Sequence, residues 1–204
     1  MTPPPLTLGD ISDHRTYERE RDEFRREVIA TKKLRRVTIG PVVTLVFESR
    51  LTVRFQVQEM ARAEKLTTDA QIQRELDVYN RLLPGPGELS ATLFLELTTD
   101  EELRTWLPRL VGIERSIVLE IGTGTGRHQV HSEPEVTHES QLTRPEATSA
   151  VHYVRFRCDS DEVAAFDSGP VRLGVDHPEY PVGRSGVVLS EDTRNELIQD
   201  LAGD

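Results

Sequence analysis

Apolar residues near the start of the chain recur at helical spacing. Tyr17, Phe24 and Val28 lie on one side of residues 14–34, between runs of Glu and Arg. This pattern predicts a long amphipathic N-terminal helix whose outer face is solvated and rich in ion pairs. The prolines that precede it predict a stiff, disordered lead-in over residues 1–6.

Runs of β-branched and other apolar residues predict strands in the rest of the chain. Strands are expected at residues 35–40, 42–49, 51–58, 88–97, 116–121, 127–130, 150–158 and 171–180. Helices are expected at residues 59–66, 69–83, 98–112 and 160–166, and after Ser190. A polar stretch predicts a long loop over residues 132–149. Residues 51–58 are assigned to a strand because apolar and polar residues alternate strictly there.

The predicted helices and strands interleave without the regular strand–helix–strand rhythm of a parallel sheet. We therefore predict an α+β fold with a mixed, mostly antiparallel sheet, flanking helices and the long N-terminal helix. The 204 residues, of which 36% are hydrophobic, can bury one core of this kind. A single domain is expected over residues 7–204.

Charge and cysteine content narrow the class of protein. A net charge of −10 argues against nucleic acid or an anionic membrane as a partner, because most of the surface repels phosphate. The basic run at residues 31–36 suits the C-terminal end of the first helix, where cations complement the helix dipole. The N-terminus lacks the pattern of a signal peptide, and Cys158 is the only cysteine. We therefore expect a cytoplasmic protein without a disulfide or a cysteine-rich metal site.

Residues 118–126, "VLEIGTGTG", match the glycine-rich loop that opens a methyltransferase fold, which raises S-adenosylmethionine as a ligand. Such a loop requires a helix directly after its last glycine. The residues after Gly126 have no helical periodicity, and Pro134 follows soon. We favour a β-hairpin in which residues 116–121 enter, the glycines turn and residues 127–130 return. S-adenosylmethionine binding is the less favoured alternative.

A first polar group gathers in residues 54–64. If a strand passes into a helix at Glu59, then Gln58, Glu59 and Arg62 meet at the corner between them. Amide, carboxylate and guanidinium groups together can grip an anion or the main chain of a partner. The plainer interpretation is a polar network that only fixes the corner.

A second polar group flanks the Pro-Gly turn at residues 84–87. It consists of Tyr79, Asn80, Glu88 and Ser90, and its plainer interpretation is a helix cap followed by exposed strand residues.

Histidines and the cysteine form the remaining candidates for chemistry. The histidines of the second half are His128, His131, His138, His152 and His177. Scattered surface histidines are the favoured interpretation, with a zinc or iron site as the alternative. Cys158 ends a predicted strand, so a buried, inert thiol is favoured over a nucleophile.

Residues 43–64, 75–97 and 151–180, in this order and at this chain length, resemble the bacterial family DUF3501, whose members have no assigned function. The resemblance implies that the characteristic polar positions are Gln56, Gln58, Glu59, Arg62, Glu64, Asn80, Glu88, Ser90 and His177. Members tend to be encoded near rubrerythrin-like and iron–sulfur proteins, which implies a redox protein as partner.

Three functions fit these observations. The first is a cytoplasmic accessory or binding protein, without a metal or cofactor of its own, that works with a redox partner and binds through Arg62. The second is an enzyme in which Glu59 or Glu88 acts with His177 as acid and base on a polar small molecule. The third is a protein that binds S-adenosylmethionine through the glycine-rich stretch. The first two depend on the expectation that both polar groups and His177 share one hollow.

Overall fold

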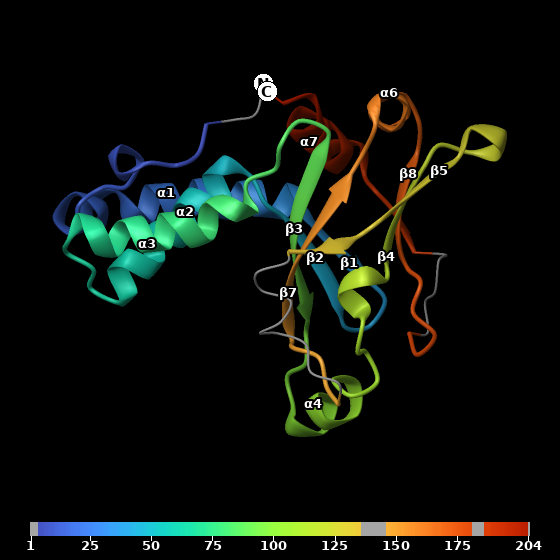
Figure 1. Cartoon of the computed structure of the whole chain (residues 1–204), viewed down its shortest axis with the longest axis horizontal. Coiled ribbons are helices and arrows are strands. Elements are labelled where there is room, and N and C mark those ends of the chain that lie inside the picture. Colours follow the sequence, from blue (N-terminus) through green and yellow to red (C-terminus); the bar gives the residue numbers. More distant parts are fainter. Residues whose placement is uncertain (1–3, 136–145, 181–185, 204) are drawn as a thin grey trace.

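Two antiparallel sheets pack on a shared core, and a layer of helices lies beside one of them (Figure 1). The computed structural model describes residues 4–135, 146–180 and 186–203. Within these residues every strand pairing is antiparallel. The predicted α+β class, with flanking helices and a long N-terminal helix, is confirmed, although the strands form two sheets and not one.

Both sheets contribute their inner faces to the main core. The five-stranded sheet has the order β1-β2-β3-β7-β6, and the four-stranded sheet has the order β5-β4-β8-β9. The first contains β1 (Arg36–Ile39), β2 (Val43–Phe47), β3 (Glu88–Leu95), β6 (Glu133–Pro134) and β7 (Val151–Arg157). The second contains β4 (Ile117–Ile121), β5 (His128–His131), β8 (Val171–Val175) and β9 (Val187–Val188). Leu45, Leu93 and Leu119 are fully buried between them.

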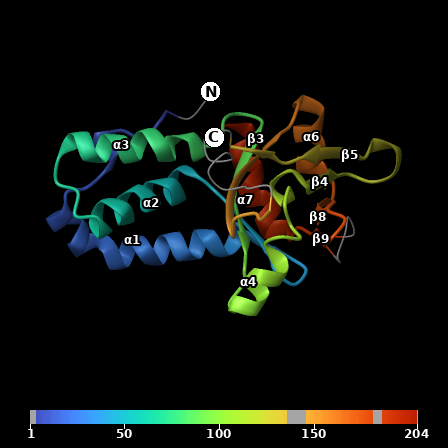
Figure 2. The same ribbon diagram turned by 60° about the horizontal axis from the view of Figure 1, so that its bottom comes forward.

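Helices flank this pair of sheets. The helical layer consists of α1 (His14–Leu34), α2 (Arg50–Ala63) and α3 (Asp69–Tyr79), beside the five-stranded sheet. The other helices are α4 (Asp100–Trp106), α6 (Ser160–Ser168) and α7 (Glu191–Ala202), with 3-10 turns η1 (Leu8–Asp10), η2 (Asn80–Leu82), η3 (Ile113–Arg115) and η4 (Gly124–Gly126). In Figure 1 and Figure 2 the helical layer and the four-stranded sheet lie on opposite sides of the five-stranded sheet. No described helix combines the length and the apolar content that crossing a bilayer requires.

Most of the predicted elements are present, with shifted ends. The helices expected from residues 69, 98 and 160 and after Ser190 correspond to α3, α4, α6 and α7. Ser190 caps α7 by accepting from the Thr193 amide, and Asp159 caps α6 by accepting from the Asp161 and Glu162 amides. The expected loop over residues 132–149 contains the short strand β6, and its residues 136–145 lie outside the described part of the chain. The strand expected to reach residue 180 ends at Val175.

α2 is a helix where alternation predicted a strand. Ser49 and Thr52 form a capping box at its start. Val53, Val57 and Ala61 recur at about one helical turn, which places them on one buried face. Two of these residues also fit the alternating pattern, so the apolar spacing alone was ambiguous and the cap was the deciding signal. The predicted strand-to-helix corner therefore does not exist.

The N-terminal strap, residues 6–13, is held by side chains from the helical layer. Leu6 is buried in a second, smaller core between the strap, α2 and α3. Arg54 of α2 donates to the Asp10 carbonyl oxygen at 2.8 Å. Residues 1–3 lie outside the described part of the chain, but Leu6, the last residue of the expected disordered lead-in, is an ordered part of the fold.

The glycine-rich segment forms the predicted β-hairpin. β4 and β5 pair antiparallel, with Ile121 opposite His128. Gly122 has a φ of +79°, and a Cβ atom there would lie 2.8 Å from the Gly126 carbonyl oxygen, so the turn requires glycine. Strand β5 follows the turn in place of the helix that a cofactor loop needs. The segment therefore has the geometry of a hairpin turn and not that of a cofactor loop that opens a helix.

Arg35 anchors α7 to the junction of α1 and β1. Its side chain is 3% exposed and pairs with Glu196 at 2.9 Å and with Asp200 at 2.7 Å, both on α7. It also donates to the Glu48 carbonyl oxygen at 3.2 Å. Burial acts to lower the pKa of Arg35, but the two carboxylates outweigh this effect and keep the guanidinium group charged.

Candidate functional site

A cavity of about 450 Å³ lies between the strap, the first turn of α1, α2 and the segment that leads into α3; we call it the Arg62 cavity. Its apolar floor consists of the half-buried side chains of Leu8, Ile11, Leu66 and Ile72, with the buried Ala61. Its polar lining consists of Ser12, Asp13, His14, Arg15, Tyr17, Gln58, Arg62, Thr67 and Asp69. Small-molecule sites typically combine an apolar lining with a few polar groups in this way.

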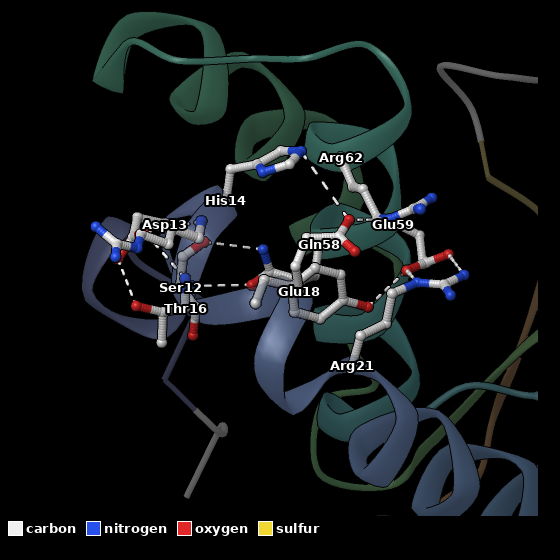
Figure 3. A network of polar contacts seen from close by, with 11 residues as sticks. Ser12, Asp13, His14, Thr16, Glu18, Arg21, Gln58, Glu59 and Arg62 are labelled. Atoms are coloured by element: carbon white, nitrogen blue, oxygen red, sulfur yellow. Dashed lines mark hydrogen bonds and ion pairs between the residues drawn. The ribbon is translucent and has the colours of Figure 1, made fainter.

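Arg62 is paired at the cavity with a carboxylate from α1. Its Nε atom donates to Glu18, and the same Glu18 carboxylate lies 4.0 Å from His14 Nε2. Figure 3 shows the Glu18 carboxylate between these two side chains. The side chains of Arg62 and Glu18 are 36% and 40% exposed, so their ion pair contributes little stability. Arg62 can therefore replace this ion pair with a contact to a different anion at a small cost in free energy.

Glu59 is bonded through both of its carboxylate oxygens to α1. It accepts from the Tyr17 hydroxyl at 2.6 Å. It also accepts from two nitrogen atoms of Arg21 at 2.8 Å (Figure 3). The Arg21 contact is the main cause that lowers the pKa of Glu59 to about 2, against the opposing effect of burial. At neutral pH Glu59 is a fixed anion, which suits a structural ion pair and not a general acid.

The stability that Glu59 provides is expected to be lost in acid. The pKa of Glu59 is lowered from 4.5 in the unfolded chain to about 2 in the folded protein. The contribution of Glu59 to stability is therefore complete above pH 4.5 and is lost as the pH falls from 4.5 to about 2. We expect Glu59→Gln to unfold at a lower urea concentration than the wild type at neutral pH. The two midpoints should converge in acid, as urea titrations followed by circular dichroism would measure. A difference that stays constant down to the lowest pH would contradict this account.

Gln58 and Asn80 bind the main chain of the strap with their side-chain amides. Gln58 accepts from the Ser12 amide and donates to the Ser12 carbonyl oxygen, both at 2.9 Å. Asn80 accepts from the Leu6 amide at 2.8 Å and donates to the Leu6 carbonyl oxygen at 2.9 Å. Each side-chain amide thus bonds both the N–H and the C=O group of one strap residue, as the main chain of a neighbouring β-strand does. These side-chain amides were candidates for binding the main chain of a partner, but here they bind the main chain of the protein's own strap.

Gln56, Ser90 and Glu64 do not line the Arg62 cavity. Gln56 donates at 3.0 Å to the carboxylate of Glu48, which is 1% exposed and also accepts from Thr92 at 2.6 Å. Ser90 is 2% exposed, and its carbonyl oxygen accepts from the Glu48 amide at 2.7 Å. Glu64 is the exposed C-cap residue of α2.

Glu88 begins β3 and is surrounded by groups that hold it as an anion. It pairs with Arg155 at 2.6 Å and with Arg157 at 3.0 Å, and it accepts from the Gly85 amide at 3.1 Å. Burial acts to raise the pKa of Glu88, but the Gly85 amide and the two guanidinium groups outweigh it and keep the pKa below its ordinary value. Glu88 is therefore occupied in structural contacts, like Glu59.

His177 lies after β8, in the part of the fold that contains the four-stranded sheet. Its Nε2 atom is 3.1 Å from the Val111 carbonyl oxygen, and its Nδ1 atom accepts from the Glu179 amide at 3.2 Å. Glu59 belongs to the helical layer on the other side of the five-stranded sheet (Figure 1). The structure therefore does not assemble the predicted acid–base pair of Glu59 with His177.

Of the residues predicted for the site, Gln58 and Arg62 line the Arg62 cavity. The others are not in its lining, so this cavity does not bring both polar groups and His177 together. Sequence reasoning missed the contribution of the strap and of the first turn of α1, above all His14 and Arg15. The sequence predicts that His14 and Arg15 belong to a helix, but nothing in the neighbouring residues indicates which other helix they face.

The histidine and cysteine expectations have mixed outcomes. His152 is 2% exposed and lies 2.8 Å from the Thr148 hydroxyl, and burial lowers its pKa, so it is not a surface histidine. His138 lies outside the described residues. Cys158 is half-buried, not buried as expected, and burial raises the pKa of its thiol to about 12. That the thiol is inert stays a prediction. Within residues 4–135, 146–180 and 186–203, no group of three or more His, Cys, Asp or Glu could hold a metal ion.

The same fold occurs in a protein of known crystal structure. A crystal structure of a protein of unknown function from Burkholderia pseudomallei K96243 is 34% identical in sequence and superposes with a TM-score of 0.86. The match covers 97% of this chain and 100% of that chain. No match was found among curated proteins. Residues 5–201 match the family model of DUF3501, proteins of unknown function, as the sequence resemblance implied. The chain therefore belongs to the DUF3501 family.

Proposed function

We propose that this protein is a binding protein and that it holds a small amphipathic molecule in the Arg62 cavity. The observation that carries the proposal is the cavity itself. Its volume of about 450 Å³ falls in the usual range for ligand sites, ~300–1,000 Å³.

Apolar surface supplies the driving force for binding. Leu8, Ile11, Leu66 and Ile72 line the cavity and remain partly exposed, so a ligand that covers them removes apolar surface from water. The strap contributes Leu8 and Ile11, so it forms part of the apolar floor of the cavity.

Polar groups at the same cavity can orient a ligand. Gln58 is bonded to Ser12 through both its oxygen and its nitrogen atom, and Asp13 accepts from the Arg15 and Thr16 amides as the cap of α1. Arg62 and His14 both contact the exposed Glu18 carboxylate. The rim thus offers a guanidinium and an imidazole group to the polar end of a ligand.

A neutral fluorescent probe tests this proposal without assuming the charge of the ligand. We expect N-phenyl-1-naphthylamine to bind the wild type saturably, with a rise in fluorescence. Ala61→Leu fills the cavity from α2 and should weaken binding by about tenfold or more, because the added carbons occupy the space of the probe.

Ala63→Leu is the matched control, since Ala63 lies on the same helix but is exposed and outside the cavity lining. It should bind the probe like the wild type. Urea unfolding of both variants checks that the fold is retained. The absence of saturable binding by the wild type, or equal binding by both variants, would contradict the proposal.

A further inference from the structure

We infer that the polar end of the ligand is a carboxylate, that Arg62 binds it, and that Glu18 is the internal carboxylate with which it competes. This inference rests on the proposed function and specifies its ligand as an amphipathic organic acid.

Basic side chains at the cavity can bind an anion. Arg15, Arg62 and His14 are the basic groups of the lining, and Asp13 and Asp69 are the acidic ones. Asp13 is occupied by α1: it accepts from the Arg15 and Thr16 amides at 3.0 and 3.1 Å and from the Thr16 hydroxyl at 2.7 Å. Asp69 belongs to the first turn of α3, where the helix dipole offsets its charge. Arg62 and His14 meet an exposed carboxylate, that of Glu18, which lies outside the lining.

Arg62 already shows the interaction that the ligand would make. A guanidinium group has five N–H donors, and the described partner of Arg62 engages it at Nε. Its side chain is 36% exposed, so the terminal nitrogen atoms can form the bidentate contact that guanidinium and carboxylate groups favour. His14 Nε2 lies 4.0 Å from the same Glu18 carboxylate, so a carboxylate at this position meets the guanidinium group and the imidazole ring (Figure 3).

Glu18 supplies this carboxylate from within the chain. Its side chain is 40% exposed, and ion pairs between exposed side chains contribute little to stability. A ligand that also covers the apolar floor therefore gains more than the exchange of carboxylates costs. The competition gives Glu18 a role that a purely structural residue would not have: its removal should tighten binding.

Octanoate and octanol provide a matched pair of probes, because they share the apolar chain and differ in the head group. We expect calorimetry to show that the wild type binds octanoate about tenfold more tightly than octanol, as one good charge-assisted contact provides. Arg62→Met should lose about this factor for octanoate and keep its affinity for octanol. Glu18→Gln should bind octanoate severalfold more tightly. Arg19→Met, an exposed arginine of α1 outside the lining, is the control and should change neither affinity.

The outcomes separate this inference from the proposal on which it rests. If neither probe binds, the proposed function fails. If both bind with equal affinity and Arg62→Met changes neither, the cavity is a ligand site but the inferred carboxylate is wrong. Unchanged octanoate binding by Glu18→Gln would overturn the assignment of Glu18. Retained octanol binding in each variant shows that the cavity is intact.

Discussion

Replacing Arg35 with methionine is expected to lower the free energy of unfolding by about 3–5 kcal/mol. Arg35 is 3% exposed, and its guanidinium group engages Glu196, Asp200 and the Glu48 carbonyl oxygen. Methionine keeps most of the side-chain volume but removes the charge. Glu196 and Asp200 then lose the cation that they share. Asp200 is only 11% exposed, so it is left as a poorly solvated carboxylate without that cation beside it.

Urea unfolding at neutral pH, followed by circular dichroism, measures this loss. Arg36→Met is the matched control, because the neighbouring Arg36 is 47% exposed and its ion pair with Glu96 lies on the surface. The control should change the free energy of unfolding by no more than ~1 kcal/mol. Equal effects of the two substitutions would show that α7 is not anchored through Arg35.

Replacing Leu6 with alanine is expected to cost about 2–5 kcal/mol, the range for deleting a fully buried leucine side chain. Leu6 is 2% exposed and packs in the second core with Val57 and Leu76, and Asn80 holds its amide and carbonyl groups. Substitution leaves a hole where the strap meets α2 and α3.

Thermal and urea unfolding of Leu6→Ala test this expectation against Pro5→Ala. Pro5 precedes Leu6 but is exposed, so its substitution should change stability by no more than ~0.5 kcal/mol. If Leu6→Ala is as stable as Pro5→Ala, then the strap is peripheral to the fold, as the expected disordered lead-in implied.

Elements whose signals are local could be predicted from the sequence. The apolar stripe of Tyr17 and Val28 indicates α1, and both residues are buried in the structure. The glycines that follow β4 indicate a tight turn, and the lack of helical periodicity after them distinguishes a hairpin from a cofactor loop. In each case the residues that carry the signal also form the element.

The site could not be predicted in the same way, because its contacts join distant parts of the chain. Gln58 pairs with Ser12 across 46 positions, and Asn80 pairs with Leu6 across 74. The sequence singles out these amide side chains as candidates, but it does not indicate which groups they bind. The prediction also assigned Gln58 to a strand and Arg62 to a helix, which hid that both face the cavity from α2. The redox partner that the family resemblance implies stays a prediction, since none of the described contacts bears on it.

The order of the five-stranded sheet has a consequence for how the chain reaches its native state. β3 pairs on one side with the early strand β2 and on the other with β7, where Glu88 lies opposite Arg157, 69 residues later. During synthesis, the first half of the protein therefore carries an open sheet edge until β7 has left the ribosome. Closing so long a loop slows folding, and the exposed edge is where nascent copies would associate wrongly.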